Sequence, residues 1–89
     1  MKIIKSSLEL KANLNKIEDI FLIPTMGNLH EGHISLIKEA KKISKNIILT
    51  IFVNPIQFNS KNDLNSYPRT LNQDINLLKG NGVSILFTP

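Results

Sequence analysis

Residues 47–53, Ile-Ile-Leu-Thr-Ile-Phe-Val, form an almost uninterrupted apolar run in which most side chains are β-branched. Runs of this kind are typical of parallel strands that are covered on both faces by helices. Two further apolar segments, 20–23 and 83–87, are expected to be strands as well, and helical patterns lie between the strands. This alternation predicts an α/β fold with a doubly wound parallel sheet.

Three helices are expected, over residues 6–16, 33–44 and 70–80. Ser6 with Glu9, and Thr70 with Gln73, have the spacing of a capping box, in which side chains pair with the first amides of a helix. An Asn-Gly pair follows the third helix and closes it. Residues 1–5 are expected to form a short extended piece at an edge of the sheet.

The order of the strands predicts where a ligand would bind. Numbered along the chain, the strands at 20–23, 47–53 and 83–87 are expected to lie side by side in the order 3-2-1. In such sheets the ligand crevice lies beyond the carboxyl ends of the strands, where the strand order reverses. That point is beside the first strand, and the other wall of the crevice would come from a fourth strand.

The segment 24–33, Pro-Thr-Met-Gly-Asn-Leu-His-Glu-Gly-His, joins the first strand to a helix and carries both histidines of the chain. Unpaired amides and the positive end of the helix dipole favour an anion at such a helix start. Imidazole donors at His30 and His33 would follow charge onto a phosphate in a transition state. Gly32 has no Cβ, so a flat ring or a sugar can approach the backbone. The pattern predicts a nucleotide site for adenylyl transfer.

Other interpretations of this segment fit less well. Gly27 and Gly32 have the spacing of a P-loop, but His33 and Ile34 follow where Lys and Ser or Thr are required. The Gly-x-Gly-x-x-Gly pattern of a dinucleotide site does not occur. The histidines of a zinc helix are four residues apart, whereas these are three apart, with no Cys and no third His to join them. We therefore expect no metal ligand here. The alternative to a nucleotide site is that His30 and His33 are ordinary solvated residues at the start of a helix.

Composition narrows the possible partners. The net charge of +4 comes largely from lysines, and with a single Arg and few aromatic residues it indicates a solvated surface. There is no Cys, which fits a reducing compartment. No apolar run approaches the ~18 residues of a membrane span, and the N-terminus lacks a signal-peptide pattern. We expect a cytoplasmic protein with no nucleic-acid or membrane partner.

A second polar loop, Asn54-Pro55-Ile56-Gln57-Phe58, follows the second strand and is expected to lie beside the first loop. The amides of Asn54 and Gln57 offer donors and acceptors suited to the hydroxyl and carboxylate groups of a small substrate. Taken alone, Asn-Pro is also an ordinary turn, and Gln57 an ordinary loop residue.

Taken together, three segments resemble the pantothenate synthetase (pantoate–β-alanine ligase) family. They are 24–33, quoted above, 51–58, Ile-Phe-Val-Asn-Pro-Ile-Gln-Phe, and 67–71, Tyr-Pro-Arg-Thr-Leu. They occur in the family's order and spacing, and the last strand at 83–89 also resembles that of the family. His-x-Gly-His alone marks the wider nucleotidyltransferase superfamily, whereas its combination with the other two segments is specific. The resemblance implies a Rossmann-like sheet of the HIGH-type nucleotidyltransferases.

The family condenses pantoate with β-alanine, using ATP and Mg²⁺, through a pantoyl adenylate. By this resemblance the ATP loop would consist of Met26, Gly27, Asn28, Leu29, His30, Glu31, Gly32 and His33. His30 and His33 would be catalytic residues that contact phosphates, with His33 in the proton-donor position. Gln57 would bind pantoate and border the β-alanine position, and Asn54 would shape the same pocket. Pro24, Thr25 and Met26 would line the crevice between the substrates. No residue here is implied as a ligand of Mg²⁺.

Family members are roughly three times longer than this chain. The resemblance therefore implies that residues 1–89 are the N-terminal part of the ATP- and pantoate-binding domain, with the rest of that domain and a C-terminal domain absent. We expect a homodimer at full length and association of the 89 residues by themselves. Two alternatives stay open. One is a non-catalytic or split α/β module that binds nucleotide, and the other is a nucleotidyltransferase that acts on another small substrate.

Overall fold

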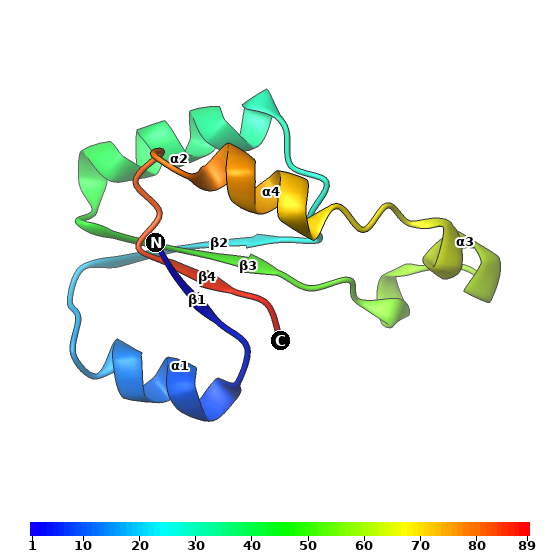
Figure 1. Cartoon of the computed structure of the whole chain (residues 1–89), viewed down its shortest axis with the longest axis horizontal. Helices are drawn as coiled ribbons and strands as arrows, with labels where there is room; N and C mark the ends of the chain where they lie inside the picture. Colours follow the sequence, from blue (N-terminus) through cyan, green and yellow to red (C-terminus); the bar gives the residue numbers. More distant parts are fainter.

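The computed structural model describes residues 1–89 as one parallel sheet with helices on both faces (Figure 1). The strands are β1 (Lys2–Ile4), β2 (Ile20–Thr25), β3 (Asn46–Ile51) and β4 (Ile85–Phe87). The α-helices are α1 (Ser7–Leu14), α2 (Glu31–Ile43), α3 (Lys61–Ser66) and α4 (Leu71–Leu78), and a 3-10 turn η1 covers Pro55–Gln57. None of these helices combines the length and the hydropathy that a membrane span requires.

All strand pairs of the sheet are parallel, in the order β1-β4-β3-β2. The expected α/β fold is confirmed, and so is the 3-2-1 order of the three strands that the sequence predicts. The expected N-terminal edge strand is β1, which pairs with the outer side of β4. β2 forms the other edge. The loops that follow the carboxyl ends of β2 and β3 therefore lie beside each other, as expected.

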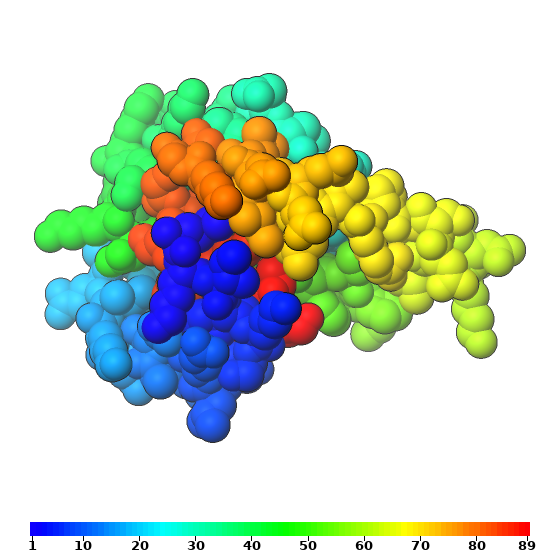
Figure 2. Space-filling view, viewed as in Figure 1, coloured from blue at the N-terminus to red at the C-terminus, as the bar shows by residue number.

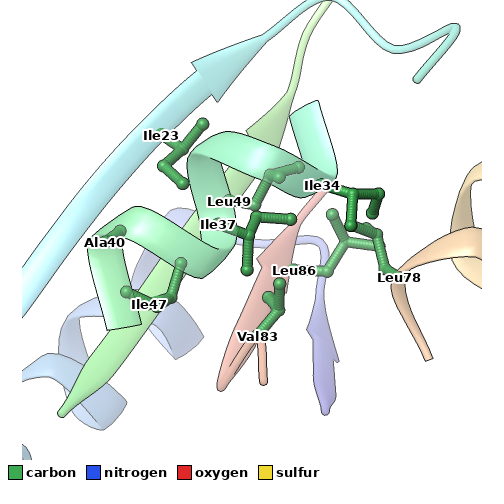
Figure 3. Packing of buried hydrophobic residues seen from close by; sticks show 9 residues of the cluster. All are labelled: Ile23, Ile34, Ile37, Ala40, Ile47, Leu49, Leu78, Val83 and Leu86. Carbon is green, nitrogen blue, oxygen red and sulfur yellow. The ribbon is translucent and has the colours of Figure 1, made fainter. Parts of the chain in front are cut away.

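The main core lies between the sheet and the pair α2 and α4, which cover one face together (Figure 1). Its nine buried side chains are Ile23, Ile34, Ile37, Ala40, Ile47, Leu49, Leu78, Val83 and Leu86 (Figure 3). On the opposite face α1 covers a smaller cluster of Ile4, Ile48 and Ile85. Because Ile47 and Leu49 face one cluster and Ile48 the other, β3 is buried on both faces, as its apolar run predicts.

The α1 side of the sheet is only partly covered. Leu22 on the edge strand β2 is 57% exposed, and Phe52 after β3 is 50% exposed. An open strand edge with apolar side chains is a place where another chain can pair. The expected association of the 89 residues stays a prediction that this surface supports.

Several boundaries differ from those that the sequence predicts. α1 ends at Leu14 and β3 at Ile51, each two residues early. Ser6 Oγ caps α1 by accepting from the Glu9 amide at 3.1 Å. The predicted Thr70–Gln73 capping box is wrong, because Thr70 makes no side-chain cap bond to α4.

α3 was not expected, although Ser60 and Asp63 have the spacing of its cap: Ser60 Oγ accepts from the Asp63 amide at 3.1 Å. With the residues around it, α3 projects from the body of the molecule, as the space-filling view shows in yellow (Figure 2). Residues 67–70, which lead into α4, form no helix or strand.

Candidate functional site

The loop between β2 and α2 has a conformation that glycine permits. Gly27 has φ +85° and Asn28 has φ +53°, so two successive residues are in the left-handed region. A Cβ on Gly27 would lie 3.1 Å from Ile51 Cγ2 and 3.2 Å from Asp74 Oδ2. The loop is thus packed directly against β3 and α4, and any other residue at position 27 would be both strained and crowded.

Thr25 fixes the beginning of this loop. Its hydroxyl donates to the Thr50 carbonyl at 2.8 Å and accepts from the Gly27 amide at 3.1 Å. One side chain therefore joins the end of β2 to β3 and starts the turn. Both hydrogen bonds of the Thr25 hydroxyl are made with the backbone. Only the other atoms of Thr25 are therefore left to line the predicted crevice.

Asp74 on α4 holds the middle of the loop. The residue is 3% exposed, and its carboxylate accepts from the Asn28 amide at 3.0 Å and from the Leu29 amide at 2.9 Å. The Thr70 hydroxyl donates to the same carboxylate, at 3.2 Å from either oxygen. Burial of a carboxylate is costly unless it is hydrogen-bonded, and this one has three donors.

Asp74 was not among the site residues predicted from the sequence, although a signal was present. Leu71, Ile75 and Leu78 mark the apolar stripe of α4, and position 74 falls within the same stripe. A carboxylate inside an apolar stripe calls for buried hydrogen-bond donors, which here come from the loop.

His30 and His33 cap α2 reciprocally. His30 is the N-cap residue, and its Nδ1 accepts from the Gly32 amide at 3.0 Å. His33 Nδ1 accepts from the His30 amide at 3.1 Å, and the ring centroids are 4.3 Å apart. The helix consequently begins at Glu31, before the predicted start at His33. Two imidazoles thus take the roles that Ser or Thr and Glu or Gln have in an ordinary capping box.

Gly32 has a different immediate role from the one expected. A Cβ at this position would lie 2.7 Å from His30 Cε1. The flat ring that approaches the Gly32 backbone is therefore the imidazole of His30 itself. Any side chain at position 32 would displace this ring and open the cap.

The cap changes how an anion would be bound at this helix start. Unpaired amides were expected here, but the amides of His30, Gly32 and His33 all have partners. The His33 amide donates to the His30 carbonyl, and the other two donate to imidazole nitrogens. Because both Nδ1 atoms accept hydrogen bonds, each neutral ring carries its proton on Nε2. The site therefore offers the two imidazole donors that the sequence predicts, as Nε2–H groups, whereas these three amides are not free to bind an anion.

Partial burial lowers the pKa of His33 below its ordinary value of 6.5. The positive charge of a protonated His30 lowers the pKa further, and the carboxylate of Asp74 opposes both effects. The neutral form, which the cap requires, is thus favoured at neutral pH.

Thermal stability should fall as the pH decreases below about 6.5. In the unfolded chain His33 has its ordinary pKa and takes up a proton at a higher pH than in the folded chain, so acid favours unfolding. The contribution of neutral His33 to the stability of the folded chain is complete above pH 6.5. It is lost as the pH falls through the lower pKa that His33 has in the folded state. Melting temperatures at about pH 7.5 and about pH 5.5, on either side of the ordinary histidine pKa, check this.

The matched variant is His33→Gln, which keeps a side-chain oxygen for the His30 amide but does not titrate. Its melting temperature should fall less between the two pH values than that of the parent chain. Equal falls in both proteins would show that His33 does not carry the effect.

The residues predicted to bind pantoate and β-alanine line one cleft at the carboxyl ends of β2 and β3. This cleft of about 460 Å³ is lined by Pro24, Thr25, Met26, Thr50, Phe52, Asn54 and Gln57. Asn54 Oδ1 accepts from the Ile56 amide at 3.1 Å and caps η1, which leaves the amide nitrogen for a ligand. All five predicted residues are therefore brought together, from two segments far apart in the sequence.

A second cleft, of about 580 Å³, shares Met26 and Phe52 with the first and is also lined by Gly27 and Asp74. His30 and His33 line neither cleft. They follow Met26 and Gly27 along the same loop, so the predicted nucleotide and substrate positions are joined through this loop.

The described residues do not fit a magnesium site. Mg²⁺ prefers several oxygen ligands, above all carboxylates. Asp74 is the buried carboxylate of the site, and its oxygens already accept from three donors. No group of three His, Cys, Asp or Glu side chains in residues 1–89 has the arrangement of a metal site.

Residues 2–89 match the family model described as Pantoate-beta-alanine ligase. The chain is 48% identical over 89 residues to a pantothenate synthetase of Idiomarina loihiensis, and 53% identical over 70 residues to that of Vibrio atlanticus. It covers 32% and 24% of these two relatives, and thus spans about a third or less of their length.

Solved structures give the same result. One is the pantoate-beta-alanine ligase from Francisella tularensis complexed with beta-gamma ATP and beta-alanine. Its TM-score is 0.95 at 44% identity, and the match covers all of this chain and 35% of that one. The pantothenate synthetase from Thermus thermophilus gives a TM-score of 0.92 at 39% identity, and the match covers 32% of that chain.

Proposed function

Because this chain belongs to the pantoate–β-alanine ligase family, we propose that residues 1–89 form the N-terminal part of the ATP- and pantoate-binding domain of a pantothenate synthetase. The observation that carries the proposal is the single cleft that Asn54 and Gln57 form with residues 24–26. The loop that carries His30 and His33 starts from the same strand end. A polar substrate pocket and a pair of imidazole donors thus flank one loop.

The proposed reaction has two steps. The carboxylate of pantoate attacks the α-phosphate of ATP and releases pyrophosphate, which gives pantoyl adenylate. The amine of β-alanine then attacks the acyl carbon, and AMP leaves with the oxygen that had joined the acyl group to phosphorus. ATP is consumed as a co-substrate.

The side chains suit the first step. The amides of Gln57 and Asn54 would donate to oxygens of pantoate and fix the direction of its carboxylate. The Nε2–H groups of His30 and His33 would donate to phosphate oxygens, where negative charge increases as the pyrophosphate leaves. His33 has the proton-donor position by its family resemblance, and Met26 to Gly32 would enclose the nucleotide. No residue of this chain is proposed to bind Mg²⁺.

The proposal includes a cytoplasmic location, pantoate, β-alanine and ATP as ligands, and a homodimer of the longer protein. It includes no membrane or nucleic-acid partner. These features follow from the family and from the charge pattern of the sequence.

The test is a chimera in which residues 1–89 replace the matching 35% of the Francisella tularensis ligase. Exchange of labelled pyrophosphate into ATP measures the first step alone. We expect exchange that depends on pantoate. A folded chimera that binds ATP but shows no pantoate-dependent exchange would support the alternative of a nucleotide-binding module or another nucleotidyltransferase.

A further inference from the structure

The segment 67–71 resembles the family as closely as the two loops do, yet the proposed reaction gives it no role. Tyr67 and Arg69 are used locally: the Arg69 guanidinium donates to the carbonyl of Tyr67 at 3.3 Å and to that of Leu64 at 3.4 Å. Thr70 points elsewhere, since its hydroxyl donates to Asp74. This segment is therefore connected to the loop that carries His30 and His33 (residues 26–33, the histidine loop) through the carboxylate of Asp74.

Asp74 is the contact by which α4 determines the loop conformation. Its two oxygens accept from successive amides, Leu29 at Oδ1 and Asn28 at Oδ2, so the carboxylate fixes both peptide planes at once. Asn28 has a positive φ, which a non-glycine residue rarely adopts without support from its surroundings. Buried and held by the Thr70 hydroxyl, the carboxylate supplies that support.

The next residue along the loop is His30, whose amide donates to His33 Nδ1. A shift of the peptide at Leu29 would move this amide and break the reciprocal cap. His33 would then lose the bond that places its proton on Nε2, and the backbone that carries the His30 ring would shift with the His30 amide. Asp74 thereby controls which ring nitrogens point at a ligand and in what direction.

We propose that Asp74 is a positioning residue for adenylate formation, which aims the Nε2–H donors of His30 and His33 by holding the Asn28 and Leu29 amides. The inference rests on the proposed function. Asp74 touches neither the reacting atoms nor the imidazoles. Thr70 orients the carboxylate, which gives the segment 67–71 its role.

Asp74→Asn tests the proposal. The amide oxygen can accept from one loop amide, but the new NH₂ group faces the other amide, donor against donor. We expect the pantoate-dependent exchange rate of the chimera to fall by ~10–100-fold, since a misplacement of about 1 Å can cost 10²-fold. The KM for pantoate should change little, because Asp74 does not line the cleft that carries Gln57.

Two further variants serve as controls. Asp63→Asn removes the same charge from an exposed position on α3 and should exchange label at the parental rate. Thr70→Val leaves both loop bonds of Asp74 intact and should lose less activity than Asp74→Asn.

Ring ¹⁵N NMR of the full 89-residue chain gives a readout that does not depend on ATP. At neutral pH the parent should show both rings with the proton on Nε2, and Asp74→Asn should show mixed tautomers at His33. Parental tautomers together with a parental exchange rate in Asp74→Asn would overturn the positioning role. If the parent chimera shows no pantoate-dependent exchange, the proposed function fails, and parental tautomers in Asp74→Asn would then reject the positioning role independently.

Discussion

Replacement of His33 by alanine should lower the rate of pantoate-dependent pyrophosphate exchange by ~10²–10³-fold, the usual effect of losing a donor to developing charge. The ring supplies one of the two Nε2–H donors, and its Nδ1 also holds the His30 amide at 3.1 Å. ATP affinity should change much less, because the donor acts mainly on charge that develops in the transition state. The measurement is exchange by the chimera, together with ATP binding by calorimetry.

His33→Gln separates the two roles of this side chain. It keeps an acceptor for the His30 amide but places no ring N–H at the ligand, so its exchange rate should stay low while the cap remains. Lys38→Ala, at an exposed position on the same helix, is the control and should behave like the parent. An unchanged exchange rate in His33→Ala would remove His33 from the reaction.

Replacement of Gln57 by leucine should raise the KM for pantoate by ~10–100-fold. Substrate oxygens left unpaired in a closed site cost about 1–3 kcal/mol, and about 1.4 kcal/mol corresponds to tenfold. ATP affinity should be nearly unchanged, because Gln57 lies in the cleft after β3 and away from the histidine cap.

Asn59→Leu is the matched control, since it removes an exposed amide from the same loop and lines neither cleft. It should leave the KM for pantoate unchanged. If Gln57→Leu weakens ATP binding as much as pantoate binding, the assignment of Gln57 to pantoate is wrong.

The architecture could be predicted from the sequence because it depends on patterns that repeat along the chain. The run at 47–53 predicts a strand buried on both faces, and the structure has it between two clusters. Right-handed crossovers then determine the strand order and place both polar loops at one end of the sheet. That is why Asn54, Gln57 and residues 24–26 could be expected in one cleft.

The details of the site depend on contacts that local patterns do not encode. Histidine is not among the preferred N-cap residues, so the start of α2 was predicted two residues too late. Thr70 has the spacing of a cap, but its hydroxyl pairs with Asp74. Asp74 in turn meets the Asn28 amide 46 residues away, and only the fold brings these groups together. The roles of the site residues toward ATP and pantoate stay predictions.

In the proposed first step, a carboxylate held by Gln57 attacks the α-phosphate of a nucleotide held by the histidine loop. The fate of the carboxylate oxygen in the chimera is the decisive test of this step. Pantoate labelled with ¹⁸O in its carboxylate is incubated with ATP and β-alanine, and the ¹⁸O content of each product is measured by mass spectrometry. We predict one ¹⁸O in AMP for each pantothenate formed. Unlabelled AMP, or ¹⁸O in inorganic phosphate with ADP as the other product, would contradict the proposed chemistry.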